Sequence, residues 1–265
     1  MSPVFLKNIA INDVWQPFLN RSNIDLLKKI ESQVFINPYT PRVDRVLRFL
    51  EFPLDSARVI ILGQDPYPQE GAATGRAFEV GNLISWDQRF RNISLKNILR
   101  AVYKAYTGEI IKYSTLKEKI KSEFPVLPPG ELFTYWEKQG VLLLNTSFTC
   151  EPGNPGSHRN LWKLFTARLL VFINERAGNA VWFLWGNHAI EASLPLKLKN
   201  YIALMHPMMC YDKPSRQADF LYGDINCFER LADAIDWTGY CNPCITRNRT
   251  QVITKDKNAA DPGNL

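Results

Sequence analysis

The sequence lacks several features that would assign it to a common class of enzyme or membrane protein. It has three histidines in 265 residues, so a histidine-rich metal cluster is excluded. It has no G-x-S-x-G turn for a nucleophilic serine and no G-x-x-x-x-G-K-[ST] phosphate loop. Its longest apolar runs, such as residues 180–185, are far too short to cross a bilayer, so we expect no membrane association.

Targeting signals and paired cysteines are also scarce. The first residues, MSPVFLKNIAINDVW, lack the basic-then-apolar order of a secretory signal. The five cysteines are odd in number and widely spaced, which argues against a disulfide framework. Cys241 and Cys244 form a single C-x-x-C, and zinc usually needs a second pair of ligands. We therefore expect a cytoplasmic protein without a metal, or a nuclear or viral-host one if its source is not bacterial.

The composition suits a globular protein with a polyanionic partner. Hydrophobic residues make up 46% of the chain, enough for a large core in a single domain. The net charge of +6 favours a partner such as nucleic acid, although many basic proteins bind none.

Apolar periodicity predicts alternating strands and helices along most of the chain. The expected strands are residues 59–62, 141–144, 180–185 and 201–205. The expected helices are residues 14–35, 43–49, 94–106, 162–175, 188–193 and 220–237, with Ser94 as an N-cap and a proline-rich loop at 121–130. Alternation of this kind predicts an α/β fold, a single-domain three-layer α/β/α arrangement with a central, mainly parallel four-stranded sheet. We assign residues 1–240 to this domain and residues 241–265 to a polar C-terminal tail.

Polar groups follow three of the four predicted strands. Asp65 lies just beyond the first strand, Asn145 ends the second and His206 follows the fourth. Ligands of parallel α/β sheets bind beyond the carboxyl ends of the strands, so we expect these groups to share a site. Without a metal or a serine nucleophile, the site belongs to a hydrolase that uses water or to a non-catalytic binding protein.

The segments around these strand ends resemble the motifs of uracil-DNA glycosylases. Gly63–Pro68 reads GQDPYP, similar to the family's GQDPYH, and Gly75–Phe78 matches the G-x-x-F that follows it. Four further segments agree in order: residues 94–97 at a helix start, the Asn145 strand, WGNHA at 185–189, and MHP at 205–207.

The resemblance implies a role for each residue at these strand ends. The family removes uracil from DNA by hydrolysis of the N-glycosidic bond, after the base has been flipped out of the duplex. Asp65 would stabilise the sugar cation and hold the attacking water, and His206 would hydrogen-bond uracil O2. Asn145 would accept from N3–H and donate to O4, a pattern that cytosine reverses. Phe78 would stack on the base, and Tyr67 would exclude a 5-methyl group.

The resemblance also implies the surroundings and partners of the site. Gln64 would contact the base mainly through its backbone. The residues expected to contact DNA are Pro66, Ser94, Gly186, Asn187, Pro207, Met208, Met209, Cys210 and Tyr211. The partner would be single- or double-stranded DNA that contains uracil, bound by a monomer without a cofactor. A small acidic protein that mimics DNA is a further expected partner.

The sequence departs from the family pattern in three places, one in the GQDPYH motif and two in the minor-groove loop. Pro68 replaces a histidine and has no N–H to donate. Cys210 aligns with the leucine wedge that fills the space left by a flipped base, and Met208, Met209 or Tyr211 could replace it. The loop before Phe220 is about four residues longer than in the family and more polar.

These departures leave three hypotheses open. The first is an enzyme that excises uracil. The second is a glycosylase-like protein that binds DNA or protein with little catalysis, which Pro68 and the altered loop favour slightly. The third is an enzyme for another deaminated base, against which Tyr67 and Asn145 argue because they define a small pyrimidine pocket.

Overall fold

The computed structural model describes residues 2–240, and its centre is a sheet of four parallel strands. The strands are β1 (Val59–Gly63), β2 (Val141–Asn145), β3 (Val181–Trp185) and β4 (Tyr201–Leu204), in the order β2-β1-β3-β4. In this register Gly63 lies beside Asn145 at the carboxyl end of the sheet. The predicted tail and its two cysteines lie outside the described residues.

The strands β1 and β2 are almost entirely apolar because side chains on both faces of the sheet are covered. Every residue of β1 and β2 is buried. Val59 and Ile61 pack into the core on one face of the sheet, and Ile60 and Leu62 pack into the core on the other. This burial on two sides is typical of parallel sheets.

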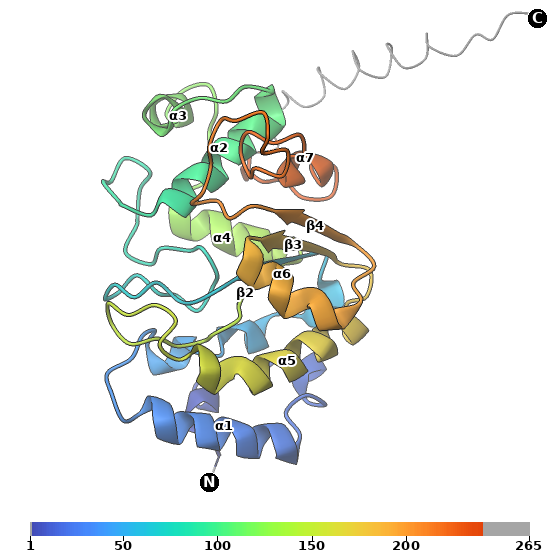
Figure 1. The fold of residues 1–265 in the computed structure, drawn as a ribbon. Coiled ribbons are helices and arrows are strands. Elements are labelled where there is room, and N and C mark those ends of the chain that lie inside the picture. Colours follow the sequence, from blue (N-terminus) through green and yellow to red (C-terminus); the bar gives the residue numbers. More distant parts are fainter. Residues whose placement is uncertain (1, 241–265) are drawn as a thin grey trace, which may run out of the picture.

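Helices cover the two faces as separate layers (Figure 1). One layer contains α1 (Arg21–Val34), α5 (Arg159–Arg176) and α6 (Asn187–Ser193). The other contains α2 (Ile93–Thr107), α3 (Tyr113–Ile120), α4 (Pro129–Lys138) and α7 (Cys227–Arg230). Short 3₁₀ turns occupy Val4–Leu6, Asp13–Trp15, Val43–Arg45, Arg48–Glu51, Leu54–Ser56 and Leu194–Leu196. The predicted three-layer α/β/α fold is confirmed.

Several predicted elements differ in the structure. Residues 43–49 form 3₁₀ turns instead of an α-helix. The N-cap of α2 is Asn92, so Ser94 lies inside the first turn of the helix and does not cap it. The proline-rich loop predicted at 121–130 ends earlier, because Pro129 occupies the first turn of α4, where a missing N–H costs nothing.

The largest error concerns residues 220–237, predicted as mostly helical. Only Cys227–Arg230 forms an α-helix there. Polar side chains bind the backbone instead: Asp219 accepts from Leu221 and Tyr222, and Asp236 accepts from Thr238 and Gly239. Such local bonds compete with helical ones and favour turns.

Candidate active site

The carboxyl ends of β1 and β2 bring Asn145 and Phe78 together over Gly63. Asn145 is 4% exposed, and its side chain packs against Gly63. The edge of the Phe78 ring approaches the same glycine. A buried amide with both a donor and an acceptor thus lies beside an aromatic ring, as recognition of a planar base edge requires.

Phe78 is held in an uncommon backbone conformation by its neighbours. Its φ is +65°, in the left-handed region that side chains rarely adopt. Its ring centroid lies 5.1 Å from that of Trp185 and 6.1 Å from that of His206. The ring therefore links the end of β3 with the segment after β4.

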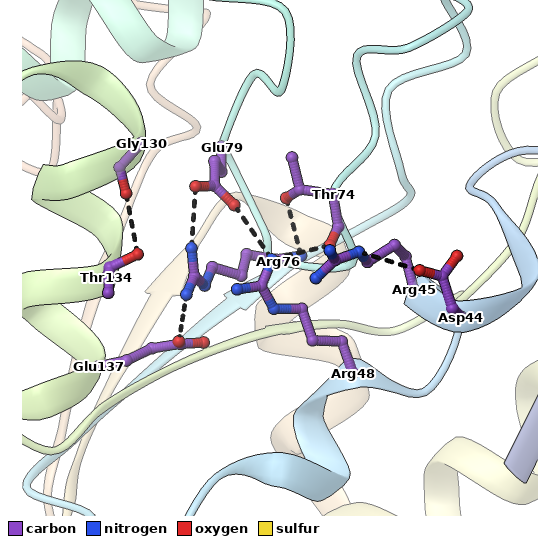
Figure 2. Close-up of polar contacts among 9 residues, drawn as sticks. All are labelled: Asp44, Arg45, Arg48, Thr74, Arg76, Glu79, Gly130, Thr134 and Glu137. Atoms are coloured by element: carbon purple, nitrogen blue, oxygen red, sulfur yellow. Dashed lines mark hydrogen bonds and ion pairs between the residues drawn. The ribbon is translucent and has the colours of Figure 1, made fainter. Parts of the chain in front are cut away.

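A buried ion network fixes the segment that carries Phe78 (Figure 2). Arg76, with 5% of its side chain exposed, donates to Glu79 at 2.9 Å and to Glu137 on α4. Arg48 donates to the carbonyl of Thr74. The bonds from Arg48 and to Glu137 tie the segment before Phe78 to the body of the protein, and the pair with Glu79 ties the segment after Phe78 to Arg76.

Asp65 follows β1 in a loop that is fastened to the end of β2. The Ser147 N–H and the Thr146 hydroxyl both donate to the carbonyl of Gln64. Burial raises the pKa of Asp65, while Gln64, Arg159, His188 and Ser147 oppose that rise. Oδ1 of Asp65 is buried without a hydrogen-bond partner in the described chain, which leaves an acceptor free for a water or a ligand.

The imidazole of His206 faces the end of β3. Its Cβ lies close to Gly186, whose φ of +89° and lack of a side chain permit the contact. The Met208 N–H donates to Nδ1 at 3.2 Å, so the proton of the neutral ring lies on Nε2. Burial lowers the pKa of His206, and His188 lowers it further. His206 is therefore a neutral ring, and its Nε2–H has no hydrogen-bond partner within residues 2–240.

Two hollows open beside these groups and share Met208. The first is a cavity of about 400 Å³ lined by Gln64, Gly186, Asn187, His188, His206, Met208, Met209, Arg216 and five neighbours. The second, of about 480 Å³, is lined by residues that include Tyr67, Arg89, Arg91, Ser94 and Met208. Burial raises the pKa of Tyr67 to about 12, which keeps its hydroxyl neutral.

The predicted site residues thus fall into connected groups. Asn145 and Phe78 meet at Gly63, Phe78 contacts His206, and Gln64 and His206 share the cavity. Asp65 lies beside Gln64 but does not line the cavity. Pro66 and Pro207 are buried, and the side chain of Asn187 is exposed.

The residues after His206 do not present the side chain that the family pattern suggested as the wedge. Cys210 turns inward: its thiol donates to the carbonyl of Pro207, and burial raises its pKa to about 12. Met208, Met209 and Tyr211 are instead 54%, 45% and 49% exposed. The surface beside the cavity is therefore apolar and methionine-rich.

Sequence reasoning assigned no role to His188, Arg89 or Arg91. His188 lines the cavity and influences the pKa of both Asp65 and His206. Arg89 and Arg91 are exposed, and neither forms an ion pair within residues 2–240. The alternation of Arg, Phe and Arg just before α2 was the available signal for a basic rim.

The described residues contain neither a metal cluster nor a membrane span. Across residues 2–240, no three His, Cys, Asp or Glu side chains gather closely enough to hold a metal ion. None of the helices in that part of the chain combines the length and apolar character needed to cross a membrane.

Comparison with known proteins connects this geometry to a family. Residues 49–222 match the uracil DNA glycosylase superfamily. Uracil-DNA glycosylase 1 of Listeria innocua is 32% identical over 203 residues, which cover 73% of this chain and 81% of that protein. Uracil-DNA glycosylase of Mycobacterium tuberculosis is 34% identical over 171 residues, which cover 64% of this chain and 66% of that protein.

Solved structures agree with the sequence matches. The wild-type UNG crystal structure from Nitratifractor salsuginis is 27% identical, with a TM-score of 0.61 over 75% of this chain and 85% of that one. Mimivirus UNG Y322L in complex with UGI is 19% identical, with a TM-score of 0.59 over 84% and 83%, and shows the shared fold. From the match over residues 49–222 and the relatives above 30% identity, the chain belongs to the uracil DNA glycosylase superfamily.

Proposed function

We propose that this protein excises uracil from DNA by hydrolysing the N-glycosidic bond and leaves an abasic site. The observation that carries the proposal is the meeting of Asn145, Phe78 and His206 at the carboxyl edge of the sheet, next to the Asp65 loop. Family membership supports the same reaction.

In the proposed reaction, Asp65 and His206 act on opposite charges. Bond cleavage builds positive charge on the deoxyribose and negative charge on the departing uracil. The Asp65 carboxylate stabilises the sugar, and its unpaired Oδ1 orients the water that attacks C1′. The Nε2–H of neutral His206 donates to uracil O2, where negative charge develops. Both groups are partly buried, which strengthens their electrostatic effect.

Selection of uracil is assigned to three side chains. Asn145 pairs with N3–H and O4, and the buried position of its amide makes a mismatched base costly. Phe78 stacks on the flipped base. Tyr67 excludes the methyl group of thymine by occupying the space near C5.

The DNA would lie across both hollows. The exposed guanidinium groups of Arg89 and Arg91, with Ser94 and Asn187, would contact phosphates, and Met208 and Met209 would face the bases.

The protein would act as a monomer, since a DNA-scanning enzyme needs an open face. Because the wedge differs from leucine, a small acidic DNA-mimicking inhibitor should bind weakly, and full inhibition at one equivalent would contradict this.

Uracil release from single-stranded oligonucleotides tests the function directly. Four oligonucleotides that differ only in one central uracil, cytosine, thymine or hypoxanthine (deaminated adenine) should yield free base from the uracil strand alone. DNA binding without release of any base would support the binding-module hypothesis instead. Release of a different deaminated base, with uracil untouched, would support the third hypothesis.

A further inference from the structure

The loop after β4, residues 205–219, exposes apolar side chains at the mouth of the cavity. It contains no helix or strand, yet Met208 and Met209 are about half exposed. A loop without regular backbone hydrogen bonds needs side-chain contacts to keep such side chains in a defined position. The structure supplies them through two charged residues of the longer, polar part of the loop, Arg216 and Asp219.

Asp219 is the anchor of the loop. Its side chain is 0% exposed, and its oxygens accept four hydrogen bonds. The donors are the backbone N–H groups of Tyr211, Leu221 and Tyr222 and Nε of Arg216, at 2.9–3.1 Å. Burial alone would raise the pKa of Asp219, but these bonds hold it below its usual range. A fully bonded, buried carboxylate of this kind fixes the chain segments that it joins.

Arg216 connects the anchor to the methionines. While Nε donates to Asp219, Nη2 of the same guanidinium donates to the carbonyl of Met209. The guanidinium also lies 5.1 Å from the centre of the Tyr211 ring, a cation–π contact. The planar fork of arginine sends separate nitrogens to the two acceptors and lies over the ring, whereas the three donors of a lysine ammonium sit on one nitrogen and cannot reproduce that span.

The other side of the loop is fastened to the catalytic histidine. The Met208 N–H donates to Nδ1 of His206, and the Met209 N–H donates to the His206 carbonyl. Asn97 of α2 donates to the carbonyl of Pro207 at 2.7 Å. Hydrogen bonds to His206 on one side and from Arg216 on the other therefore hold the backbone of Met208 and Met209 at a fixed position relative to His206.

We propose that Arg216 and Asp219 form a brace that presets Met208 and Met209 as the wedge that replaces a flipped base in duplex DNA. Arg216 is a positioning residue that acts through the two methionines. The inference rests on the proposed function and specifies how that site handles duplex DNA. A duplex loses stacking when a base leaves, and an inserted apolar side chain offsets that loss. A single strand has no such stack, so the brace matters for duplex DNA alone.

The test compares uracil release from single-stranded and duplex oligonucleotides under single-turnover conditions. Arg216→Ala should lower the duplex rate roughly tenfold or more, the usual effect of losing charge-assisted hydrogen bonds, and lower the single-strand rate much less, so that the ratio of duplex to single-strand rates falls. Arg216→Lys should lose duplex activity to a similar extent, because it keeps the charge but cannot bridge Asp219 and Met209. Lys213→Ala, which removes the same charge from the same loop, should keep the wild-type ratio of duplex to single-strand rates.

Three results would overturn the brace. Full duplex activity in Arg216→Lys would show a direct charge contact with phosphate. An equal fall on both substrates in Arg216→Ala would show that the arginine does not act on duplex DNA in particular. Fluorescence of 2-aminopurine beside the uracil should report less base flipping in Arg216→Ala, and unchanged flipping would also contradict the inference. Absence of uracil release by the wild type on single strands would instead refute the proposed function.

Discussion

A Cβ atom on Gly63 would lie 2.5 Å from Oδ1 of Asn145, closer than such contacts occur in proteins. It would also lie 2.8 Å from Cβ of Ala77, the neighbour of Phe78. The glycine that ends β1 thus leaves the space in which the amide of Asn145, proposed to select uracil, lies. The GQDP motif therefore includes a packing requirement in addition to its chemical groups.

Gly63→Ala should displace Asn145 and lower kcat/KM for uracil release by about a hundredfold, because a shift near 1 Å in a positioned group can cost that much. The measurement is steady-state uracil release from a single strand. Gly130→Ala is the matched control, since a Cβ there meets nothing within 4 Å. Equal activity of Gly63→Ala and wild type would show that Asn145 does not need its observed position.

His206 should be neutral, with its proton on Nε2, at pH 7. Because burial lowers its pKa, protonation should reduce activity only below the usual histidine value of about 6.5. The same lowered pKa means that its contribution to folding stability is present above about 6.5 and is lost as the pH falls.

Nitrogen-15 NMR of the imidazoles, with His206→Gln for assignment, reports the tautomer. The chain has only three histidines, so the spectrum should be simple. A neutral ring with its proton on Nδ1, or a charged ring at pH 7, would contradict the role of Nε2–H as a donor.

Arg76→Ala should destabilise the protein by about 3 kcal/mol or more, the usual cost of breaking a buried ion pair. Two carboxylates, Glu79 and Glu137, would lose their buried partner. Because Arg76 also fixes the segment of Phe78, KM for uracil-containing DNA should rise. Urea denaturation measures the first effect and steady-state kinetics the second.

Arg42→Ala provides the contrast, since its side chain is 84% exposed in its pair with Asp44 and surface pairs contribute little. A similar loss of stability in both variants would argue against a special role for the buried network.

Arg89→Ala combined with Arg91→Ala should reduce the salt dependence of duplex binding. Each phosphate contact contributes about 0.9 to the slope of log K against log salt, so the slope should fall by up to about 2. Fluorescence anisotropy of labelled duplex DNA at salt concentrations from about 50 to 200 mM measures this slope. Arg21→Ala removes an exposed charge from α1, which lines neither hollow, and should leave the slope unchanged.

The sequence predicted the sheet and its carboxyl edge because β-branched and apolar runs such as Val59–Leu62 end at glycine or at polar residues. It predicted poorly where side chains bind the backbone, as Asp219 and Asp236 do around the segment predicted as a helix. Pro129 was predicted in a loop because proline in the first turn of a helix and proline in a loop look alike.

Contacts within the loop after β4 could not be predicted from the sequence, although they join residues that are close along the chain. The tautomer of His206 depends on the Met208 N–H, and the direction of Cys210 depends on the Pro207 carbonyl. The bridge from Arg216 to Met209 and Asp219 depends on how the loop folds back on itself. Each of these contacts depends on the irregular backbone path of the loop, which apolar periodicity and local propensity do not predict.

Uracil release from a single-stranded oligonucleotide by the wild type and by Asp65→Asn tests the central claim most directly. The amide keeps the size of the carboxylate but cannot offset a developing positive charge on the sugar. We predict free uracil and an abasic strand from the wild type, and a rate at least about a hundredfold lower from the variant. Equal rates for the two proteins, or no uracil from either, would contradict the proposed role of Asp65.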